Sequence, residues 1–429
     1  MIKNLLYFFY LAFMVSVVGG FRAISSIAIG LILLTGFIKN KLDTGSWFNA
    51  GLRNRHLLFC SLFFTLQLLY LPFASNFNEG WKHVQVKSAL LFIPLCFYCC
   101  PFINRHRFKS LMNVYVFTMA IVLTWCLGVA FKLYYFHHAP VYVFFYHQLV
   151  RDLDHHAVQF SILVFAALIY LLQSIRHRDY LLNRTIHFLL TAYFIGGIFL
   201  LSSKLVIIFL LLYLAVYGFN LLQQKFSTRR AVAIVVMAVA LCSSSFLFTQ
   251  NPVSGRFSDV MHGDVRVITQ TSFTPNDYFN GIQFRLLQWR FVKEILQEHG
   301  AWLFGVSPAR AQQLLNQKYI STHMYTGSGR PGGDTHGYLG YNTHNQFLES
   351  LLQTGIIGLL CFIGICVEMI GMAIRQKNNQ FTALVVLLLA YTFSDAVLET
   401  QYGLVLFLFL PLFFFFGQKD KKLKTNKKA

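Results

Sequence analysis

The chain has 429 residues, of which 56% are hydrophobic and only 12% are charged, and its formal net charge is +20. A soluble surface needs about twice that charged fraction, so the composition excludes an ordinary set of soluble domains and indicates a chain that lies largely in lipid. The positive charges cluster between apolar runs, which argues against nucleic acid as a partner.

In chain order, twelve apolar runs are long enough to be interpreted as membrane spans. They lie near residues 4–19, 21–38, 57–74, 85–103, 110–131, 156–173, 186–201, 205–222, 230–249, 346–370, 380–396 and 400–417. The first run resembles a signal peptide, but a second span follows almost at once, so we expect an uncleaved anchor. The sequence therefore predicts an all-α, polytopic membrane protein with about 12 transmembrane helices.

The lysine and arginine residues test this count, because one missed span would invert every later loop. With a cytoplasmic N-terminus, most of the 36 positive residues fall on the cytoplasmic side, as the positive-inside rule requires. The prediction is a multi-pass protein of the bacterial inner membrane with both termini in the cytoplasm. It divides the chain into spans 1–9 (1–249), a large periplasmic loop (250–345), spans 10–12 (346–418) and a basic cytoplasmic tail (419–429).

The large loop is predicted to contain helical structure of its own. Apolar residues recur at helical spacing at Phe284, Leu287, Phe291 and Ile295, which predicts an amphipathic helix that stops at Gly300. The glycine-rich segment 327–342 that follows is either a tether or a lid over a bound substrate.

Several polar residues could carry chemistry. His344 and Asn345 stand where the loop re-enters the membrane, and a histidine there can accept a proton from a hydroxyl group. The alternative is that His344 is only an interfacial polar residue. Asp395 and Glu399 are one turn apart, and they either orient an acceptor sugar or cap a helical hairpin.

A metal site is not expected. All eight cysteines lie inside apolar runs, which disfavours disulfides and thiolate ligands. His155 and His156 are adjacent, so they point apart on a helix. The triplet Asp152-Leu153-Asp154 matches the D-x-D pattern of nucleotide-sugar transferases, but it would face away from cytoplasmic nucleotide sugars, so a solvated turn is favoured.

One stretch, THNQFLESLLQTGIIGLL (343–360), resembles the signature of the bacterial O-antigen ligase and Wzy-type polymerase superfamily. Arg285 and Trp289 resemble the R-x-x-x-W helix of that family, and LFGV (303–306) is similar to the turn that follows it. Ser202-Ser203-Lys204 stands where the family has a Ser-Arg pair at a helix break. DHHAVQFSILVF (154–165) and LETQYGLVLFLF (398–409) resemble the start of its sixth span and its last hairpin.

The resemblance implies a metal-independent, inverting GT-C-type glycosyltransferase that needs no cofactor and takes a glycan from undecaprenyl pyrophosphate. It makes His344 the base that activates the acceptor, and Arg285 a bidentate ligand of the pyrophosphate, with Lys204 at the same membrane face. The further substrate-binding candidates are Trp289, Asn345, His155, His156, Asp395 and Glu399. Lys204 lacks the planar fork of an arginine, and two bland alternatives stay open: Arg285 stacks on Trp289, and Lys204 snorkels to the interface.

The favoured function is an O-antigen ligase of lipopolysaccharide biosynthesis, with the lipid A core as acceptor. The closest alternative is a Wzy-type O-antigen or exopolysaccharide polymerase, whose acceptor is a lipid-linked glycan, and the sequence does not separate the two. A polysaccharide transporter or flippase is disfavoured, because its ionisable residues would lie near the bilayer midplane. A sugar-binding or scaffolding protein would share the loop without needing His344. Apart from substrates, the expected partners are membrane lipids.

Overall fold

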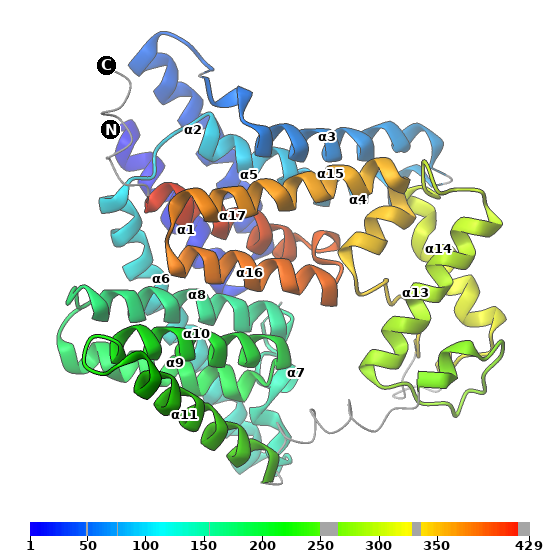
Figure 1. Ribbon diagram of the computed structural model, residues 1–429. Coiled ribbons are helices and arrows are strands. Elements are labelled where there is room, and N and C mark those ends of the chain that lie inside the picture. The colour runs from blue at the N-terminus through cyan, green and yellow to red at the C-terminus, as the bar shows by residue number, and fades with distance from the viewer. Residues whose placement is uncertain (49, 75, 154, 249–264, 328–335, 419–429) are drawn as a thin grey trace.

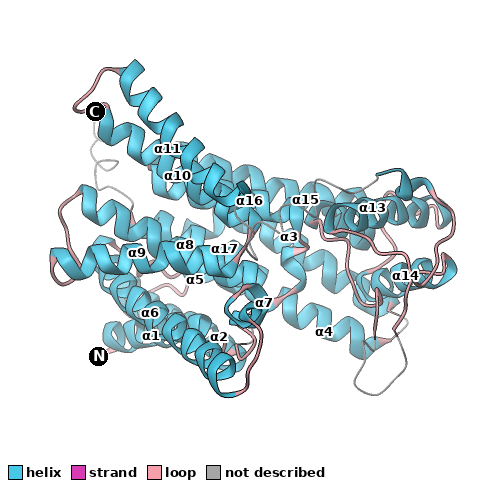
Figure 2. Cartoon of the chain, turned by 90° about the horizontal axis from the view of Figure 1, so that it is seen from below, coloured by secondary structure: helices cyan, strands magenta, loops and turns pink. Residues whose placement is uncertain are grey.

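The computed structural model describes residues 1–418 except 49, 75, 154, 249–264 and 328–335. The described residues form helices and contain no strand (Figures 1 and 2). The helices are α1 (Ile2–Gly19), α2 (Arg22–Thr44), α3 (Arg55–Tyr70), α4 (Phe77–Lys87), α5 (Ala89–Tyr98), α6 (Arg105–Phe136), α7 (Tyr146–Leu149), α8 (Ala157–Arg176), α9 (Arg184–Leu201), α10 (Lys204–Leu222), α11 (Thr228–Phe248), α13 (Gly281–Glu298), α14 (Pro308–Ser321), α15 (Gln346–Gln376), α16 (Asn379–Ser394) and α17 (Gln401–Gly417). Short 3-10 helices cover Ala50–Arg53, Leu71–Phe73, Val141–Phe144, Val265–Thr269 and Val397–Glu399.

Eight of the described helices are long and apolar enough to cross a membrane, namely α1, α2, α3 with its extension to Phe73, α6, α8, α9, α10 and α15. The last two predicted spans correspond to α16 and α17, which are apolar but shorter. The predicted span at 85–103 is not one helix, because α4 ends at Lys87 and α5, which contains Pro94, runs only from Ala89 to Tyr98. The all-helical membrane class is confirmed, whereas the number twelve stays a prediction.

The membrane bundle has its core around α8 and α17. Both helices are apolar on every side, as expected for helices at the centre of a bundle, and most of their side chains are buried. Phenylalanine rings fill the spaces between helices, for example Phe409 of α17 at 4.5 Å from Phe13 of α1 and 5.4 Å from Phe97 of α5, measured between ring centroids. The buried phenylalanines thus contribute much of the packed interior of the bundle.

A second hydrophobic core lies beside one end of the bundle, where α13 and α14 stand apart from the other helices (Figure 1). Phe284, Leu287, Phe291 and Ile295 are all buried in this core, so the predicted amphipathic helix is confirmed. A capping box at Asn280 begins α13, and Gly300, with φ of 58°, follows its end. This loop unit is thus a packed structure with its own core.

α15 contains a break that joins the loop unit to the membrane bundle. Gly355 has φ of 65° and ψ of −163°, which is not helical, and the turn 302–307 packs into the break. The turn replaces lost helical bonds: Val306 N donates to Leu352 O at 2.8 Å, and Ile356 N donates to Trp302 O at 2.9 Å. The backbone groups freed by the kink are thereby satisfied, as they must be within a membrane.

Candidate functional site

His344 lies in the short segment between the loop unit and α15. Its backbone is left-handed, with φ of 46°, and its N–H donates to Asn342 Oδ1 at 3.0 Å. On its two sides, Thr343 donates to Glu349 Oε2 through N at 3.2 Å and Oγ1 at 2.8 Å, and Asn345 caps α15 by accepting from the first backbone N–H groups of the helix. Both neighbours of His344 are therefore fixed to the first turn of α15.

Asp395 is the acidic partner of His344. The His344 Nδ1 and Asp395 Oδ1 atoms are 3.6 Å apart, and both side chains are partly exposed, at 24% and 22%. Tyr391 Oη donates to the other carboxylate oxygen at 2.7 Å, and Ala396 N donates to Oδ1 at 2.9 Å. Burial alone would raise the pKa of Asp395, but the nearby His344 and the hydrogen bond from Tyr391 hold it below the usual range. The carboxylate is therefore charged at neutral pH.

Arg285 reaches the same place from α13. Its Nε donates to Ser394 O at 3.2 Å and its Nη1 donates to Gly281 O at 2.7 Å. Burial lowers the pKa of Arg285, and the nearby charge of Asp395 opposes this effect. The guanidinium thus bonds to one backbone carbonyl at the end of α16 and to one at the start of its own helix, α13.

Trp289 lies one turn further along α13. Its side chain is partly buried, and its indole Nε1 is a buried donor without a hydrogen-bond partner among the described residues. Buried polar atoms usually have a partner, so this donor is a candidate contact for a substrate oxygen.

The two adjacent histidines have different surroundings. His156 caps α8 by accepting from Val158 N at 3.3 Å, its ring lies 4.3 Å from that of His147, and its charge acts on Asp395. His155 is only 7% exposed and packs on Tyr402, with ring centroids 4.4 Å apart. His156 thus belongs to the edge of the site, whereas His155 lies in the packing between helices.

No group of three or more histidine, cysteine, aspartate or glutamate residues in the described part of the chain could hold a metal ion. Asp152 pairs with Arg151 at 3.3 Å, and Asp154 lies outside the described residues. The metal-free chemistry expected from the resemblance stays a prediction.

Lys204 is the first residue of α10. α9 ends at Leu201, and Ser202 adopts a left-handed conformation with φ of 49°, so the predicted helix break is confirmed. α9 runs antiparallel to both α8 and α10 (Figure 1), which places Lys204 at the same end of the bundle as the start of α8. It is therefore at the end of the bundle that carries His156.

Glu399 belongs to a separate buried network below the site. It forms an ion pair with Lys87 Nζ, whose side chain is only 1% exposed, and Gln353 also bonds to it. Gln353 Nε2 donates to Glu349 Oε1 at 2.7 Å, which connects Glu399 to the residues that hold Thr343. Burial would raise the pKa of Glu399, but the adjacent Lys87 ammonium holds it below the usual range. Asp395 and Glu399, predicted as one pair, are thus divided between two sites.

Residues that sequence reasoning did not select complete the arrangement. Tyr391 lies four residues before Asp395, so its helical spacing could have indicated the contact. Lys87 is a lone cation in the apolar run 85–103, which normally implies a buried partner. The partner itself, Glu399, lies 312 residues away, and no local signal identifies it.

The fold and the site define a helical membrane protein whose polar centre lies where a packed loop unit meets the bundle. Residues 189–363 match the family model Wzy_C, described as O-Antigen ligase. This match covers Lys204, Arg285 and His344, and it confirms the resemblance of this part of the chain to the O-antigen ligase and Wzy-type polymerase superfamily. The family is one of glycan ligases and polymerases that use lipid-linked substrates. No curated protein matches the chain.

Proposed function

We propose that the protein is an O-antigen ligase-like glycosyltransferase that moves a polysaccharide from undecaprenyl pyrophosphate to the lipid A core at the periplasmic face of the inner membrane. The observation that carries this proposal is the convergence of His344, Asp395 and Arg285 from three separate elements. A base, its carboxylate partner and a buried cation are the groups that such a transfer requires.

The chemistry follows from these three groups. Asp395 faces His344 Nδ1, so Nε2 is the nitrogen that accepts the proton of the acceptor hydroxyl, and the carboxylate stabilises the imidazolium that forms. The acceptor oxygen attacks the anomeric carbon of the donor from the opposite face, and the bond from that carbon to the pyrophosphate oxygen breaks with inversion. Its electron pair leaves on the pyrophosphate, whose charge Arg285 stabilises.

The other candidates support this centre in different ways. Lys204 supplies a second cation for the pyrophosphate, and the Trp289 indole N–H offers a donor to a sugar or phosphate oxygen. Asn345 is a positioning residue, because its side chain caps α15 and donates to Phe393 O at 3.4 Å. His156, at the start of α8, is a further candidate contact for the substrate.

Cationic side chains take the place of a divalent metal in this proposal. Transfer by purified protein should therefore persist in excess chelator. Activity that disappears with chelator and returns with magnesium or manganese would contradict this part, and would direct attention to Asp152 and Asp154.

The decisive experiment supplies purified protein with an undecaprenyl-pyrophosphate glycan and two acceptors in separate reactions. A covalent product on the lipid A core supports the ligase. Elongation of a lipid-linked repeat unit alone would assign the polymerase instead. Movement of the donor across a vesicle membrane without a new glycosidic bond would contradict both and favour a flippase.

A further inference from the structure

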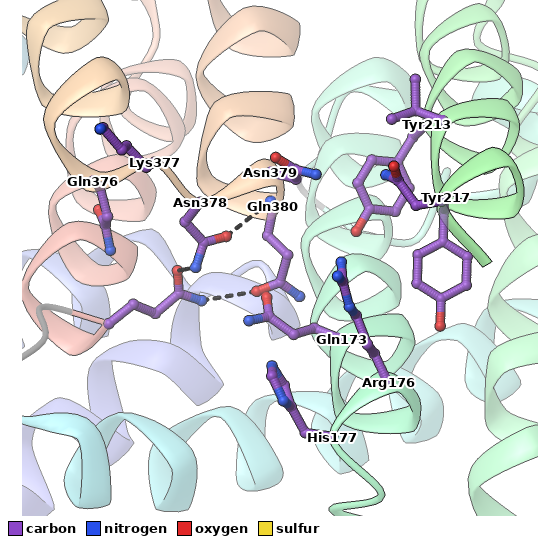
Figure 3. Close-up of a pocket in the computed structure, with 13 residues that line it drawn as sticks. Gln173, Arg176, His177, Tyr213, Tyr217, Gln376, Lys377, Asn378, Asn379 and Gln380 are labelled. Atoms are coloured by element: carbon purple, nitrogen blue, oxygen red, sulfur yellow. Dashed lines mark hydrogen bonds between the residues drawn. The ribbon is translucent and has the colours of Figure 1, made fainter. Parts of the chain in front are cut away.

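A cavity of about 440 Å³ lies at the far end of α15 from His344, between the ends of α8, α10 and α15 and the start of α16 (Figure 3). Its wall is rich in amides, tyrosines and cations: Gln173, Arg176, His177, Tyr213, Val216, Tyr217, Asn220, Gln376, Lys377, Asn378, Asn379, Gln380 and Gln418. α15 has 31 residues, and at about 1.5 Å per residue it exceeds the roughly 30 Å thickness of the hydrocarbon core. The cavity and the His344 site therefore lie at opposite faces of the membrane.

The cavity is positively charged. Arg176 and Lys377 line it together with His177, and no acidic residue is among its described lining. Neither Arg176 nor Lys377 forms an ion pair with an acid in the described part of the chain. By contrast, the adjoining cavity of about 360 Å³ contains Lys109, whose charge is already matched by Asp179 at 2.6 Å. The larger cavity thus has the charge to receive an anion.

Its amide groups point to a ligand with both donors and acceptors. Asn378 Nδ2 donates to Gln418 Oε1, and Gln418 Nε2 donates to Gln380 Oε1, each at 2.9 Å (Figure 3). However, Gln173 Oε1 and both polar atoms of the Gln376 side chain are buried without a partner among the described residues. Buried polar groups usually have a partner, so a group that fills the cavity and bonds to them is favoured.

An apolar groove leads from this cavity along the outer surface of α15 and α16. It has a volume of about 380 Å³ and shares Lys377 and Asn379 with the polar cavity. Its other lining residues are almost all apolar: Ile370, Ala373, Ile374, Thr382, Val385, Val386 and Leu389. Several of these side chains are exposed, Ile374 at 67% and Val386 at 46%, which on a membrane helix means exposure to lipid. The two hollows together have the shape of a polar head joined to a hydrocarbon chain.

We propose that this site binds an anionic glycerophospholipid of the leaflet at this end of the bundle. Its phosphate lies between Arg176 and Lys377, its glycerol or headgroup hydroxyls bond to Gln173 and Gln376, and one acyl chain follows the groove. A free phosphate ion would use the polar cavity but would leave the groove empty. The bound lipid would hold the ends of α8, α10, α15 and α16 together, and this role is independent of the reaction proposed above.

The test is native mass spectrometry of the purified full-length protein in a nonionic detergent, with equimolar phosphatidylglycerol and phosphatidylcholine of identical chains. We expect the wild type to retain phosphatidylglycerol at least about fivefold over phosphatidylcholine. The double variant Arg176→Gln, Lys377→Gln should weaken phosphatidylglycerol binding about thirtyfold, because each of the two basic residues near an anionic lipid contributes about 1 kcal/mol. The control Arg53→Gln, Arg55→Gln removes two exposed cations elsewhere and should leave the preference unchanged.

A second variant separates the lipid from a free anion. Val386→Trp fills the groove without touching the cations, so it should reduce lipid retention several-fold while the protein stays folded by its thermal unfolding temperature. Equal retention of the two lipids by the wild type, or an unchanged preference in the Arg176, Lys377 variant, would overturn the proposal. So would an unchanged retention in Val386→Trp together with competition by millimolar inorganic phosphate, which would assign the cavity to a free anion.

Discussion

At the scale of single residues, His344 is distinguished from other loop histidines by the contacts on both sides of it. Glu349 holds Thr343, and Asn345 caps α15, so the imidazole is presented to Asp395 by a backbone that cannot easily rotate. Loss of a positioned general base typically costs about a hundredfold to ten-thousandfold in rate.

We therefore expect His344→Ala to lower kcat of glycan transfer by that factor while donor binding is retained, since the imidazole acts on the acceptor. The measurement is product formation alongside equilibrium binding of the lipid-linked donor. His299→Ala is the matched control, because His299 is exposed at the end of α13. Near-normal transfer by a folded His344→Ala protein would remove the base assignment.

Arg285 differs from His344 in that it acts on the donor. Arg285→Ala should weaken donor binding and also turnover, with kcat/KM reduced about tenfold to a hundredfold for the loss of a charge-assisted hydrogen bond. Arg285→Lys should recover only part, because it keeps the charge and loses the fork. Arg310→Lys, on the exposed face of α14, is the control. Donor affinity that does not change in Arg285→Ala would contradict the role in phosphate binding.

At the scale of elements, the break in α15 depends on one glycine. A Cβ at Gly355 would lie 2.2 Å from Leu303 O, and the φ of 65° is itself unfavourable for any other residue. Backbone strain alone costs about 1–3 kcal/mol. Gly355→Ala should therefore lower the thermal unfolding temperature and disturb the packing of the turn 302–307 against α15. Gly128→Ala, where a Cβ meets nothing within 4 Å, should be neutral or stabilising. Equal unfolding temperatures for the two variants would show that the break is not required.

The second element-scale prediction concerns the ion pair between α4 and the segment after α16. Breaking a buried pair by removing one partner costs about 3–5 kcal/mol, so Glu399→Gln should be strongly destabilised at pH 7. The pKa of Glu399 is held below its usual range by Lys87. The contribution of the Glu399 carboxylate to the free energy of unfolding is therefore fully present above the ordinary glutamate pKa of about 4.3. It is lost as the pH falls through the lower pKa that Glu399 has in the folded protein.

The measurement is the difference in thermal unfolding between wild type and Glu399→Gln in detergent at a series of pH values. The difference should stay constant from about pH 8 to pH 5 and shrink only below about pH 4.3. A difference that already disappears near pH 6 would mean that Glu399 is not held as a carboxylate by Lys87.

At the scale of the whole molecule, every site assignment depends on the direction in which the chain crosses the membrane. The charge pattern predicts that both termini lie in the cytoplasm. A reporter active only outside the cytoplasm should work when fused at Gly255 and fail when fused after Lys428, two positions outside the described residues. The reverse result would place the His344 site in the cytoplasm and contradict the proposed reaction.

Features that depend on a local pattern could be predicted from the amino-acid sequence. Apolar runs long enough to cross a bilayer predict membrane spans. The 3.6-residue periodicity of Phe284, Leu287, Phe291 and Ile295 predicts the amphipathic helix α13. The short blocks around Arg285 and His344 were sufficient to indicate the family. The same local reasoning could not resolve the region 85–103, where the end of α4 and the whole of α5 replace a single span. The hydropathy of this segment does not indicate that a helix ends before Ser88 and another begins after it.

Which polar groups lie in contact depends on how the helices pack in three dimensions. Asp395 and Glu399 are close in sequence, yet one faces His344 and the other pairs with Lys87, because Asp395 is extended and a short 3-10 helix then redirects the chain. The break at Gly355 is stabilised by the turn 302–307, which is inserted in it and bonds to the backbone groups that the break leaves free. These contacts join residues tens to hundreds of positions apart, and they are set by how helices pack in three dimensions, which no periodicity within one segment encodes.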